Sequence, residues 1–382
     1  MRPAWRDLDP ALAGVIGPAL PGLVDEVIGA VEAAVPDYSA GVEENVRLGV
    51  RQALDGFVEL VVTGSDAGLP ERQIYVEFGA GEFRVGRTLD ALMRAYRAGA
   101  QVAWRRLAEE GDRGGVEPGT LYKLAEAIFA YIDELSAASA EGFAREQSRA
   151  VSELQASRHR LVELLLREPA ASANAIETAA AQAEWRLPPA LAVLAFRADR
   201  PERVAARLPD GSLTSEVDGV RVAIVPDPAG PGRRRTVERA LAGARGGLGH
   251  TVDWPETPES ARRARLALGL AAARGGGLVV AAEHLLDLVL ARDEVLAGDL
   301  AKRALAPFDE LPAGRRTRLL ETLAAWLDAH GEARPAAERL HVHVQTVRYR
   351  LGQLRDLLGG ALDDPERRLE LALALRVSGR AG

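Results

Sequence analysis

Residues 336–351, near the C-terminus, read AAERLHVHVQTVRYRL and decide the architecture of the last part of the chain. Ala336, Ala337 and Leu340 place two small residues and one large apolar residue on one side of a short predicted helix. Pro335 is well placed to open this helix, because its missing N–H costs nothing at the first helical position. Small residues let a second helix approach closely, so the stretch predicts a helix-turn-helix.

The second predicted helix has two different faces. Val347, Leu351 and Leu354 recur at i, i+4 and i+7, which predicts a buried apolar stripe. The opposite side carries hydrogen-bonding and cationic groups with little acid: Gln345, Arg348, Tyr349 and Gly352. Such a face suits the major groove of double-stranded DNA, whose base edges offer acceptors to Arg and paired donor and acceptor sites to Gln. The alternative is an ordinary solvated helix, but the spacing of two helices favours DNA binding.

The C-terminal region resembles the last domain of PucR/CdaR-type bacterial transcriptional regulators. The resemblance rests on the Leu-Leu-Glu-Thr-Leu run at 319–323, on Trp326-Leu327, on the helix-turn-helix, and on 363–376. The family pattern of His, any residue, Asn, Thr, an aliphatic, any residue, Tyr and Arg is met by His343, Thr346, Val347, Tyr349 and Arg350. Gln345 stands where the family has Asn, which predicts a change in base preference or in a hydrogen bond at the helix start.

The helix-turn-helix and this resemblance together predict the DNA-binding residues. We expect Gln345, Arg348 and Tyr349 to face the groove, and His343, Thr346 and Arg350 to meet phosphate or the helix start. In the same region, Asp364-Pro365 is expected to cap and start the last helix, where Leu369, Leu373 and Arg376 recur at helical spacing.

Composition bounds the class of protein. A chain of 382 residues with 47% apolar residues predicts two or three soluble domains. The absence of cysteine removes disulfides and thiolate metal sites and agrees with a cytoplasmic location. We expect neither a signal peptide nor a membrane span, since no long uncharged apolar run follows the first residues. Residues 312–382 contain twelve Arg and nine acidic residues, which is a net charge of +3. The whole chain has a net charge of −7, so the other residues together carry −10.

Residues 1–150 read as a helical bundle. Ser39 is a predicted N-cap, Gly64 ends that helix, and a second long helix begins near Arg87 or Thr88. Pieces at 38–41, 86–90 and 95–99, with Trp104, resemble the N-terminal domain of actinobacterial relatives, which is similar to the haemless globin-like domain of stressosome sensors. His159, the first histidine, lies beyond the bundle, so no haem or other cofactor is expected. The sequence predicts two roles for the bundle equally well: a sensory or protein-interaction module, or a module that only aids dimerisation.

A helix of nearly fifty residues is predicted from about 120 to 167, spanning about 70 Å at 1.5 Å per residue. It carries roughly two apolar positions per seven and cannot bury them alone, so we expect its middle to pair with the same helix of a second subunit. The alternative is a helix that packs on its own domain and breaks near Ser148.

The region 171–311 alternates strand and helix signals. Strands are predicted at 192–196, 213–217, 220–225 and 278–280, and helices at 236–244, 258–274 and 283–290, with one or two more over 293–308. Asp218-Gly219 is a two-residue hairpin signal. This order resembles a degenerate GGDEF-like domain without the Gly-Gly-Asp/Glu-Glu-Phe signature, so Asp218 is expected in a turn and not on a metal.

Candidates for catalysis and metal binding are weak. The run at 275–277 is expected to be a helix stop and tight turn, because it precedes a strand. His159, His250 and His284 are isolated in the sequence, and His341 and His343 point to opposite sides of a turn. We therefore predict no catalytic residues, no metal site and no enzyme activity.

The sequence predicts a mainly α multidomain chain: a globin-like helical bundle over 1–150, a helical linker over 151–170, a GGDEF-like α/β domain over 171–311 and an all-α helix-turn-helix domain over 312–382. The predicted function is sequence-specific transcription regulation by a homodimer or higher homo-oligomer, with an unidentified small-molecule or protein signal and no membrane partner. Two alternatives stay open. One is a stressosome-like interaction protein, and the other is a cyclic-dinucleotide enzyme.

Overall fold

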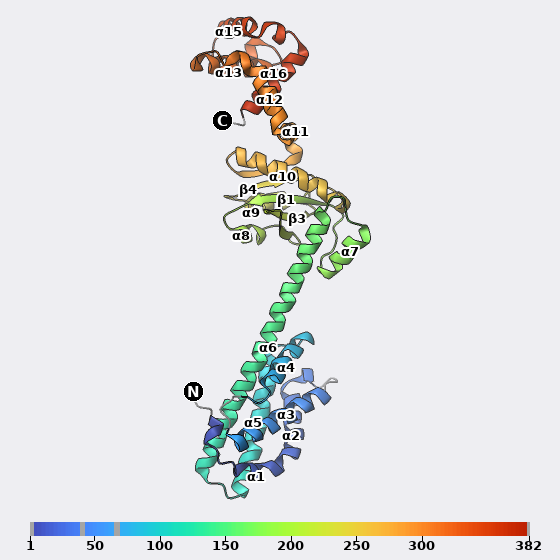
Figure 1. Ribbon diagram of the computed structural model, residues 1–382, viewed down its shortest axis with the longest axis vertical. Coiled ribbons are helices and arrows are strands. Elements are labelled where there is room, and N and C mark those ends of the chain that lie inside the picture. Colours follow the sequence, from blue (N-terminus) through green and yellow to red (C-terminus); the bar gives the residue numbers. More distant parts are fainter. Residues whose placement is uncertain (1–3, 39–42, 65–68, 380–382) are drawn as a thin grey trace. The chain divides into compact units, whose positions relative to one another are not determined.

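The computed structural model describes residues 4–38, 43–64 and 69–379 and divides into two compact units, Met1–Glu153 and Leu154–Gly382 (Figure 1). The described residues are mainly helical, with a small mixed sheet in the second unit and helix-turn-helix elements at the C-terminal end. The predicted fold class is confirmed. The predicted N-cap Ser39 lies outside the described residues.

The first unit is a bundle of helices around one apolar core. Its elements are η1 (Ala4–Asp7), α1 (Leu12–Ile16), η2 (Gly17–Ala19), α2 (Leu20–Ala34), η3 (Pro36–Tyr38), α3 (Glu43–Thr63), α4 (Arg72–Arg84), α5 (Leu89–Arg113) and the first part of α6 (Pro118–Leu166). As predicted, α5 begins after Thr88, whose hydroxyl accepts a hydrogen bond from the N–H of Ala91 at 3.1 Å. As predicted too, Gly64 follows the last residue of α3, with a φ of 57°.

We expected no membrane span in this chain, but the stretch Leu12–Ala34 is a candidate for one. By length and composition it is apolar enough to cross a membrane, with a mean hydropathy of 1.4 in its most apolar window. Leu23, Val27 and Val31 of α2 are buried in the core of the bundle. The apolar character of this stretch therefore has an account in packing, since a core helix passes the same test.

Two of the pieces that carried the N-terminal resemblance meet at a side chain that sequence reasoning did not single out. Glu82 is buried, accepts a hydrogen bond from the Tyr38 hydroxyl at 2.7 Å, and pairs with Arg87 at 2.9 Å. The Arg87 guanidinium also lies over the Tyr38 ring, 4.5 Å from its centroid. Burial and the bond to Glu82 raise the pKa of Tyr38. This cluster joins the end of α4 to the segments before α3 and α5.

Helices α4 and α6 approach each other closely at two glycines. A Cβ at Gly79 would collide with the carbonyl of Ser139, and a Cβ at Gly142 would collide with the carbonyl of Val76. The Ser139 hydroxyl donates to the Tyr75 carbonyl at 3.1 Å and pairs with the Tyr96 hydroxyl at 2.7 Å. Glycine is therefore required at both positions by the distance between the helix backbones.

The long helix α6 runs without interruption from Pro118 to Leu166, which confirms the prediction of nearly fifty helical residues. The alternative of a break near Ser148 is wrong. Its early part contributes Leu124, Ile128 and Leu135 to the core of the bundle, whereas Leu161 and Leu165 are buried in the core of the second unit. Between them, Ala144 to Ala156 are mostly exposed.

The second unit holds a mixed sheet in the order β2-β3-β1-β4-β5. The strands are β1 (Leu191–Arg197), β2 (Leu213–Val217), β3 (Val220–Pro226), β4 (Arg245–Leu248) and β5 (Gly277–Val280). β1 pairs antiparallel with β3 and β4, and β4 pairs parallel with β5. The predicted Asp218-Gly219 turn is confirmed, with φ of 52° and 71° at the two residues, the left-handed conformations of a type I′ hairpin.

The helices around the sheet are α7 (Ala173–Gln182), α8 (Pro201–Ala205), α9 (Arg233–Ala240), η4 (Trp254–Glu256), α10 (Thr257–Ala273), η5 (Ala281–Glu283) and α11 (Leu285–Arg292). Sequence patterns missed α7, α8 and β4, and placed α9 three residues too late. They predicted α10 closely, together with the turn at 275–277, where all three glycines have positive φ. Strand β4 reads Arg-Gly-Gly-Leu, and none of these residues is β-branched or aromatic.

The close crossing of α4 and α6 generates a stability prediction. Gly79→Ala should lower the free energy of unfolding of the N-terminal unit by about 1–3 kcal/mol, because the added methyl forces two backbones apart. Gly81→Ala is the matched control in the same helix, where a Cβ meets nothing within 4 Å, and it should stabilise by roughly 0.5–1 kcal/mol. Urea unfolding followed by circular dichroism measures both, and equal effects of the two variants would contradict the crossing.

Candidate nucleic-acid interface

The C-terminal helices are α12 (Glu294–Leu305), η6 (Ala306–Phe308), α13 (Ala313–Asp328), α14 (Ala333–Leu340), α15 (Val344–Leu358), η7 (Gly359–Leu362) and α16 (Pro365–Ser378). The predicted helix-turn-helix corresponds to α14 and α15. Helix α14 begins at Ala333, two residues before the predicted start. Pro335 thus lies in the first turn of α14, where N–H groups have no partner within the helix. The missing N–H of the proline therefore removes no hydrogen bond from α14, as predicted.

The turn between α14 and α15 depends on His341. This residue ends α14 in the left-handed conformation, with φ of 53°, which His adopts more readily than most residues. The N–H of Val342 then bonds the Ala337 carbonyl at 3.1 Å, which closes the helix end. His343 starts the next helix, since its Nδ1 accepts a hydrogen bond from the N–H of Gln345 at 3.2 Å.

The predicted apolar stripe of α15 is buried. Val347 and Leu354 have no exposed surface, and Leu351 is 4% exposed. They pack in one core with residues of the preceding helices: Leu319, Leu323 and Trp326 of α13, and Ala336 and Ala337 of α14. Ala301, Leu305 and Phe308 belong to the same core, so packing of the C-terminal helices includes residues before 312.

The opposite face of α15 carries the side chains predicted to read bases. Gln345, Arg348 and Tyr349 are all exposed, and Tyr349 is 69% exposed. Thr346 is half-buried in the first turn. Arg350 turns toward α13, where its Nη1 donates to the Thr322 hydroxyl at 3.2 Å. The structure thus brings three of the six predicted residues to one solvent-facing surface, places two at the helix start, and ties the sixth to the supporting helix.

Helix α16 packs against the C-terminal core through a different face from the one that the spacing of Leu369, Leu373 and Arg376 predicted. Asp364 caps α16 as predicted, accepting from the N–H groups of Glu366 at 2.9 Å and Arg367 at 3.4 Å. The buried residues of α16 are Leu371 and Ala374, whereas Leu369 is 59% exposed. Helix α16 packs along α12.

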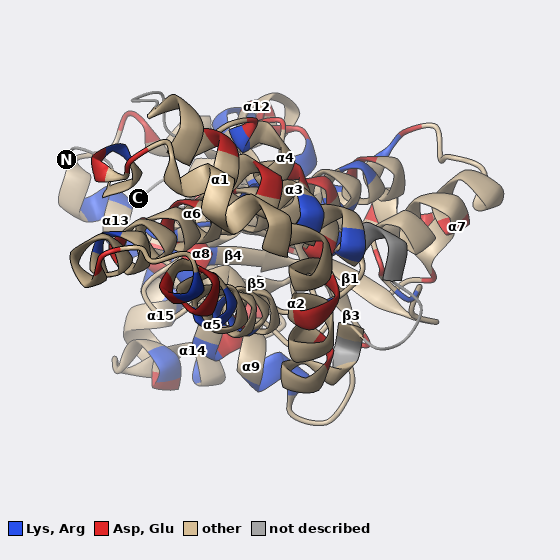
Figure 2. Cartoon of the chain, turned by 90° about the horizontal axis from the view of Figure 1, so that it is seen from below, with Lys and Arg blue, Asp and Glu red and all other residues tan. Residues whose placement is uncertain are grey.

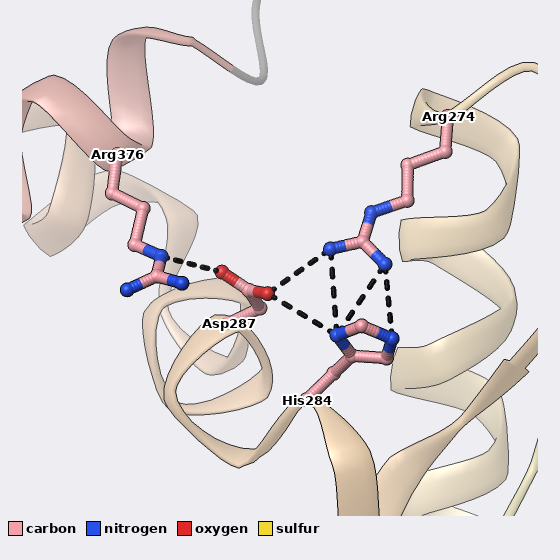
Figure 3. Close-up of polar contacts among 4 residues, drawn as sticks. All are labelled: Arg274, His284, Asp287 and Arg376. Atoms are coloured by element: carbon pink, nitrogen blue, oxygen red, sulfur yellow. Dashed lines mark hydrogen bonds and ion pairs between the residues drawn. The ribbon is translucent and has the colours of Figure 1, made fainter. Parts of the chain in front are cut away.

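Figure 3 shows a charged cluster that joins α16 to the sheet-bearing part of the unit. Asp287 of α11 is buried, and its two carboxylate oxygens engage Arg376 of α16 at 3.3 Å and Arg274, at the end of α10, at 3.1 Å. His284 lies 3.6 Å from the same carboxylate and within 3.1 Å of the Arg274 guanidinium. Asp287 therefore connects α16, near the C-terminal end, to α10 and α11.

Sequence reasoning missed this cluster and was wrong to treat His159 and His284 as isolated. His159 lies 3.2 Å from Glu163, one turn further along α6, and its Nδ1 contacts the Ser215 hydroxyl of β2. Burial lowers the pKa of His250. The i, i+3 spacing of His284, which precedes α11, and Asp287, in the first turn of α11, was a signal within the sequence, whereas Arg274 and Arg376 approach through folding alone.

Charges of both signs are distributed over the C-terminal helices (Figure 2). Several arginines there are paired with acids: Arg303 with Glu370 at 2.8 Å, Arg339 with Asp328 at 3.0 Å, and Arg316 with Asp309 at 3.0 Å. Arg348 is exposed, and residues 344–351 around it, the first two turns of α15, include no acidic residue.

These features define a multidomain chain with a helical N-terminal bundle and a C-terminal helix-turn-helix domain. Comparison with known proteins agrees: residues 5–166 match the PucR-like N-terminal domain family, and residues 319–377 match the PucR C-terminal helix-turn-helix domain family. The chain belongs to the PucR-type family of bacterial transcriptional regulators.

Three relatives illustrate the similarity. The purine catabolism regulatory protein of Bacillus subtilis (strain 168) is 48% identical over 59 residues, which are 15% of this chain and 11% of that protein. An uncharacterized protein in the pkwA 5′ region of Thermomonospora curvata is 38% identical over 90 residues, 24% of this chain and 48% of that protein. The crystal structure of a regulator of polyketide synthase expression from Bifidobacterium adolescentis is 16% identical with a TM-score of 0.30, covering 59% of this chain and 93% of that one. The matches span less than half the length of either of the two sequence relatives.

The Asp287 cluster generates a prediction on the C-terminal domain. Asp287→Ala should destabilise the packing of α16 by about 1–2 kcal/mol, a small value because the arginines remain 43% and 56% exposed and can be solvated. Hydrogen exchange of the α16 amides should become faster. Asp299→Ala, at an exposed position on α12, is the control. Equal exchange in α16 for the two variants would show that the cluster does not hold the helix.

Proposed function

We propose that this protein is a sequence-specific regulator of transcription that reads double-stranded DNA with α15. One observation carries the proposal. The buried stripe of α15 leaves Gln345, Arg348 and Tyr349 together on the exposed face of a helix-turn-helix. Arg donates two hydrogen bonds to guanine O6 and N7, and Gln pairs with adenine N6 and N7, so this face has the donors and acceptors for major-groove recognition.

The other three predicted residues take supporting roles in the proposal. His343 and Thr346 lie at the N-terminus of α15, where N–H groups and the helix dipole favour a phosphate. Arg350 holds Thr322 of α13 and is proposed to orient α15, with phosphate contact available if the side chain turns outward. Because Gln345 replaces the family's Asn and its N–H is already bonded to His343, we propose that its side chain changes base preference.

Charge supports the same orientation of the domains on DNA. The net +3 of residues 312–382 attracts the phosphate backbone, and the −10 of the remaining chain repels it. In the proposed complex the duplex contacts the C-terminal domain only. A cytoplasmic location follows from this role, since the chromosome is the partner.

The proposed assembly is a homodimer, which would place two copies of α15 on two half-sites. Exposed apolar side chains offer two surfaces. The middle of α6 offers Val151 at 57% exposure among mostly polar neighbours. Helices α11 and α12 offer a larger set, here named the α11–α12 surface: Leu285, Leu286, Val289, Val295 and Leu296. Removing this larger apolar area from water favours the α11–α12 surface as the dimer contact.

The upstream domains are proposed to receive a signal and to set the oligomeric state. For the middle domain we propose a degenerate GGDEF-like fold with no enzymatic role. Asp218, at the hairpin tip, lies in a turn and pairs with Arg265 at 3.2 Å, which is a structural use of the carboxylate.

The reading face generates a test with a matched control. Arg348→Ala should weaken binding to the authentic promoter by about 1–3 kcal/mol, because a bidentate contact to guanine is lost. Arg367→Ala removes the same charge from an exposed position on α16 and should leave promoter affinity nearly unchanged. Fluorescence anisotropy at fixed salt measures both. Promoter affinity that is unchanged by Arg348→Ala would remove this residue from the base-reading set.

The dimer surface generates a separate test. Val295→Asp places a charge within the α11–α12 surface and should convert the dimer to a monomer in light scattering at micromolar concentration. An Asp in the first turn of α12 suits the helix dipole, so the helix itself is not weakened. Val151→Asp on α6 is the comparison. A wild-type chain that is monomeric would contradict the dimer, and loss of the dimer in the Val151 variant alone would move the contact to α6.

A further inference from the structure

The helical bundle of the first unit contains a cavity of about 120 Å³. Its walls come from α2, η3, α3, α4, α5 and α6. Small residues contribute to the space, because α3 and α5 place little side-chain volume there at Gly49, Ala53, Ala100 and Ala103. A leucine at such a position would fill part of the cavity. The space is therefore specified by the sequence of the two helices.

The lining of the cavity is apolar and uncharged. Besides the small residues it consists of aliphatic and aromatic side chains, with Gln52 and four tyrosines as the polar members, and none of the described lining residues carries a charge. An ionised ligand would lose its hydration without a counter-charge, which is strongly unfavourable. A neutral, mainly apolar molecule is the class of ligand that fits.

Size sets an upper limit on that molecule. An engineered apolar cavity of about 150 Å³ in another protein stays dry and binds benzene. A cavity of about 120 Å³ accepts one six-membered ring or a molecule of similar size, and excludes a fused or macrocyclic ring system.

Two lining tyrosines give the cavity one unused hydrogen-bonding function. The Tyr131 hydroxyl donates to the Ala53 carbonyl at 2.8 Å, so its oxygen accepts from the Tyr75 hydroxyl, which lies 3.3 Å away. Each hydroxyl has a single proton, and both protons are used in this chain of bonds. Burial raises the pKa of both tyrosines, so they stay neutral at physiological pH. The oxygen of Tyr75 retains the capacity to accept a hydrogen bond from a ligand.

We propose that the bundle binds a small neutral molecule, of one six-membered ring or less, whose single O–H or N–H donates to the Tyr75 hydroxyl oxygen. This assigns a ligand class to the signal-input part of the proposed function and rests on that function only for its regulatory consequence. Binding to the bundle is independent of DNA.

Calorimetry on the full chain without DNA tests the proposal with three probes: phenol, benzene and benzoate. Phenol should bind saturably with one site, benzene should bind about fivefold more weakly because it lacks the donor, and benzoate should not bind. Tyr75→Phe removes the acceptor and keeps the bond from Tyr131 to Ala53. In this variant the affinity for phenol should fall about fivefold, to that of benzene, while the affinity for benzene stays unchanged.

Filling the cavity gives a second readout. Ala100→Leu should abolish binding of phenol and benzene, whereas Ala98→Leu, half-buried on the same helix and outside the lining, should preserve it. If Ala100→Leu fails to fold, the Tyr75→Phe comparison decides. Absence of saturable phenol binding by the wild type, or binding that survives in a folded Ala100→Leu variant, overturns the proposal. Failure of the promoter-binding test would leave these results intact, so the two proposals fail separately.

Discussion

Burial of Val347, Leu351 and Leu354 is the constraint that determines which side chains of α15 are exposed. With three apolar side chains of α15 held in a core of α13 and α14 residues, the helical period leaves only one set of side chains for solvent. Ala336 and Ala337 have small side chains that let α15 pack closely. The same packing that stabilises the domain therefore selects Gln345, Arg348 and Tyr349 as its exposed surface.

In the N-terminal bundle, the stability lost to a cavity is offset by stabilising contacts elsewhere in the bundle. Its cavity costs about 3 kcal/mol of stability at about 24 cal/mol per Å³, compared with a filled core. The close crossing at Gly79 and Gly142 and the buried cluster at Glu82 stabilise the same bundle around that space. A molecule that binds the folded bundle and not the unfolded chain would recover stability by mass action. A loosely filled core is thus a physical basis for coupling a ligand to the folded state.

Local chemistry made much of the fold predictable. The Asp218-Gly219 hairpin, the glycines at 275–277, the start of α5 near Thr88 and the cap at Asp364 depend on residues close together in the chain, so the sequence alone identifies them. The stripe and the exposed face of α15 were predictable for the same reason. Strand β4 was not, because Arg-Gly-Gly-Leu has no intrinsic strand preference and becomes a strand only between β1 and β5. Glu82 and Asp287 were missed because their partners are brought to them by tertiary packing, and the direction of Arg350 depends on Thr322 of another helix.

In the proposed function, α15 reads sequence in double-stranded DNA. Incubating the purified full chain with fragmented genomic DNA at physiological salt, then sequencing the bound fragments, tests this claim most directly. Discrete, reproducible sites that share a short motif are expected, in two half-sites about 34 Å apart if the dimer binds as proposed. Recovery of fragments in proportion to their abundance, with no shared motif, would contradict it.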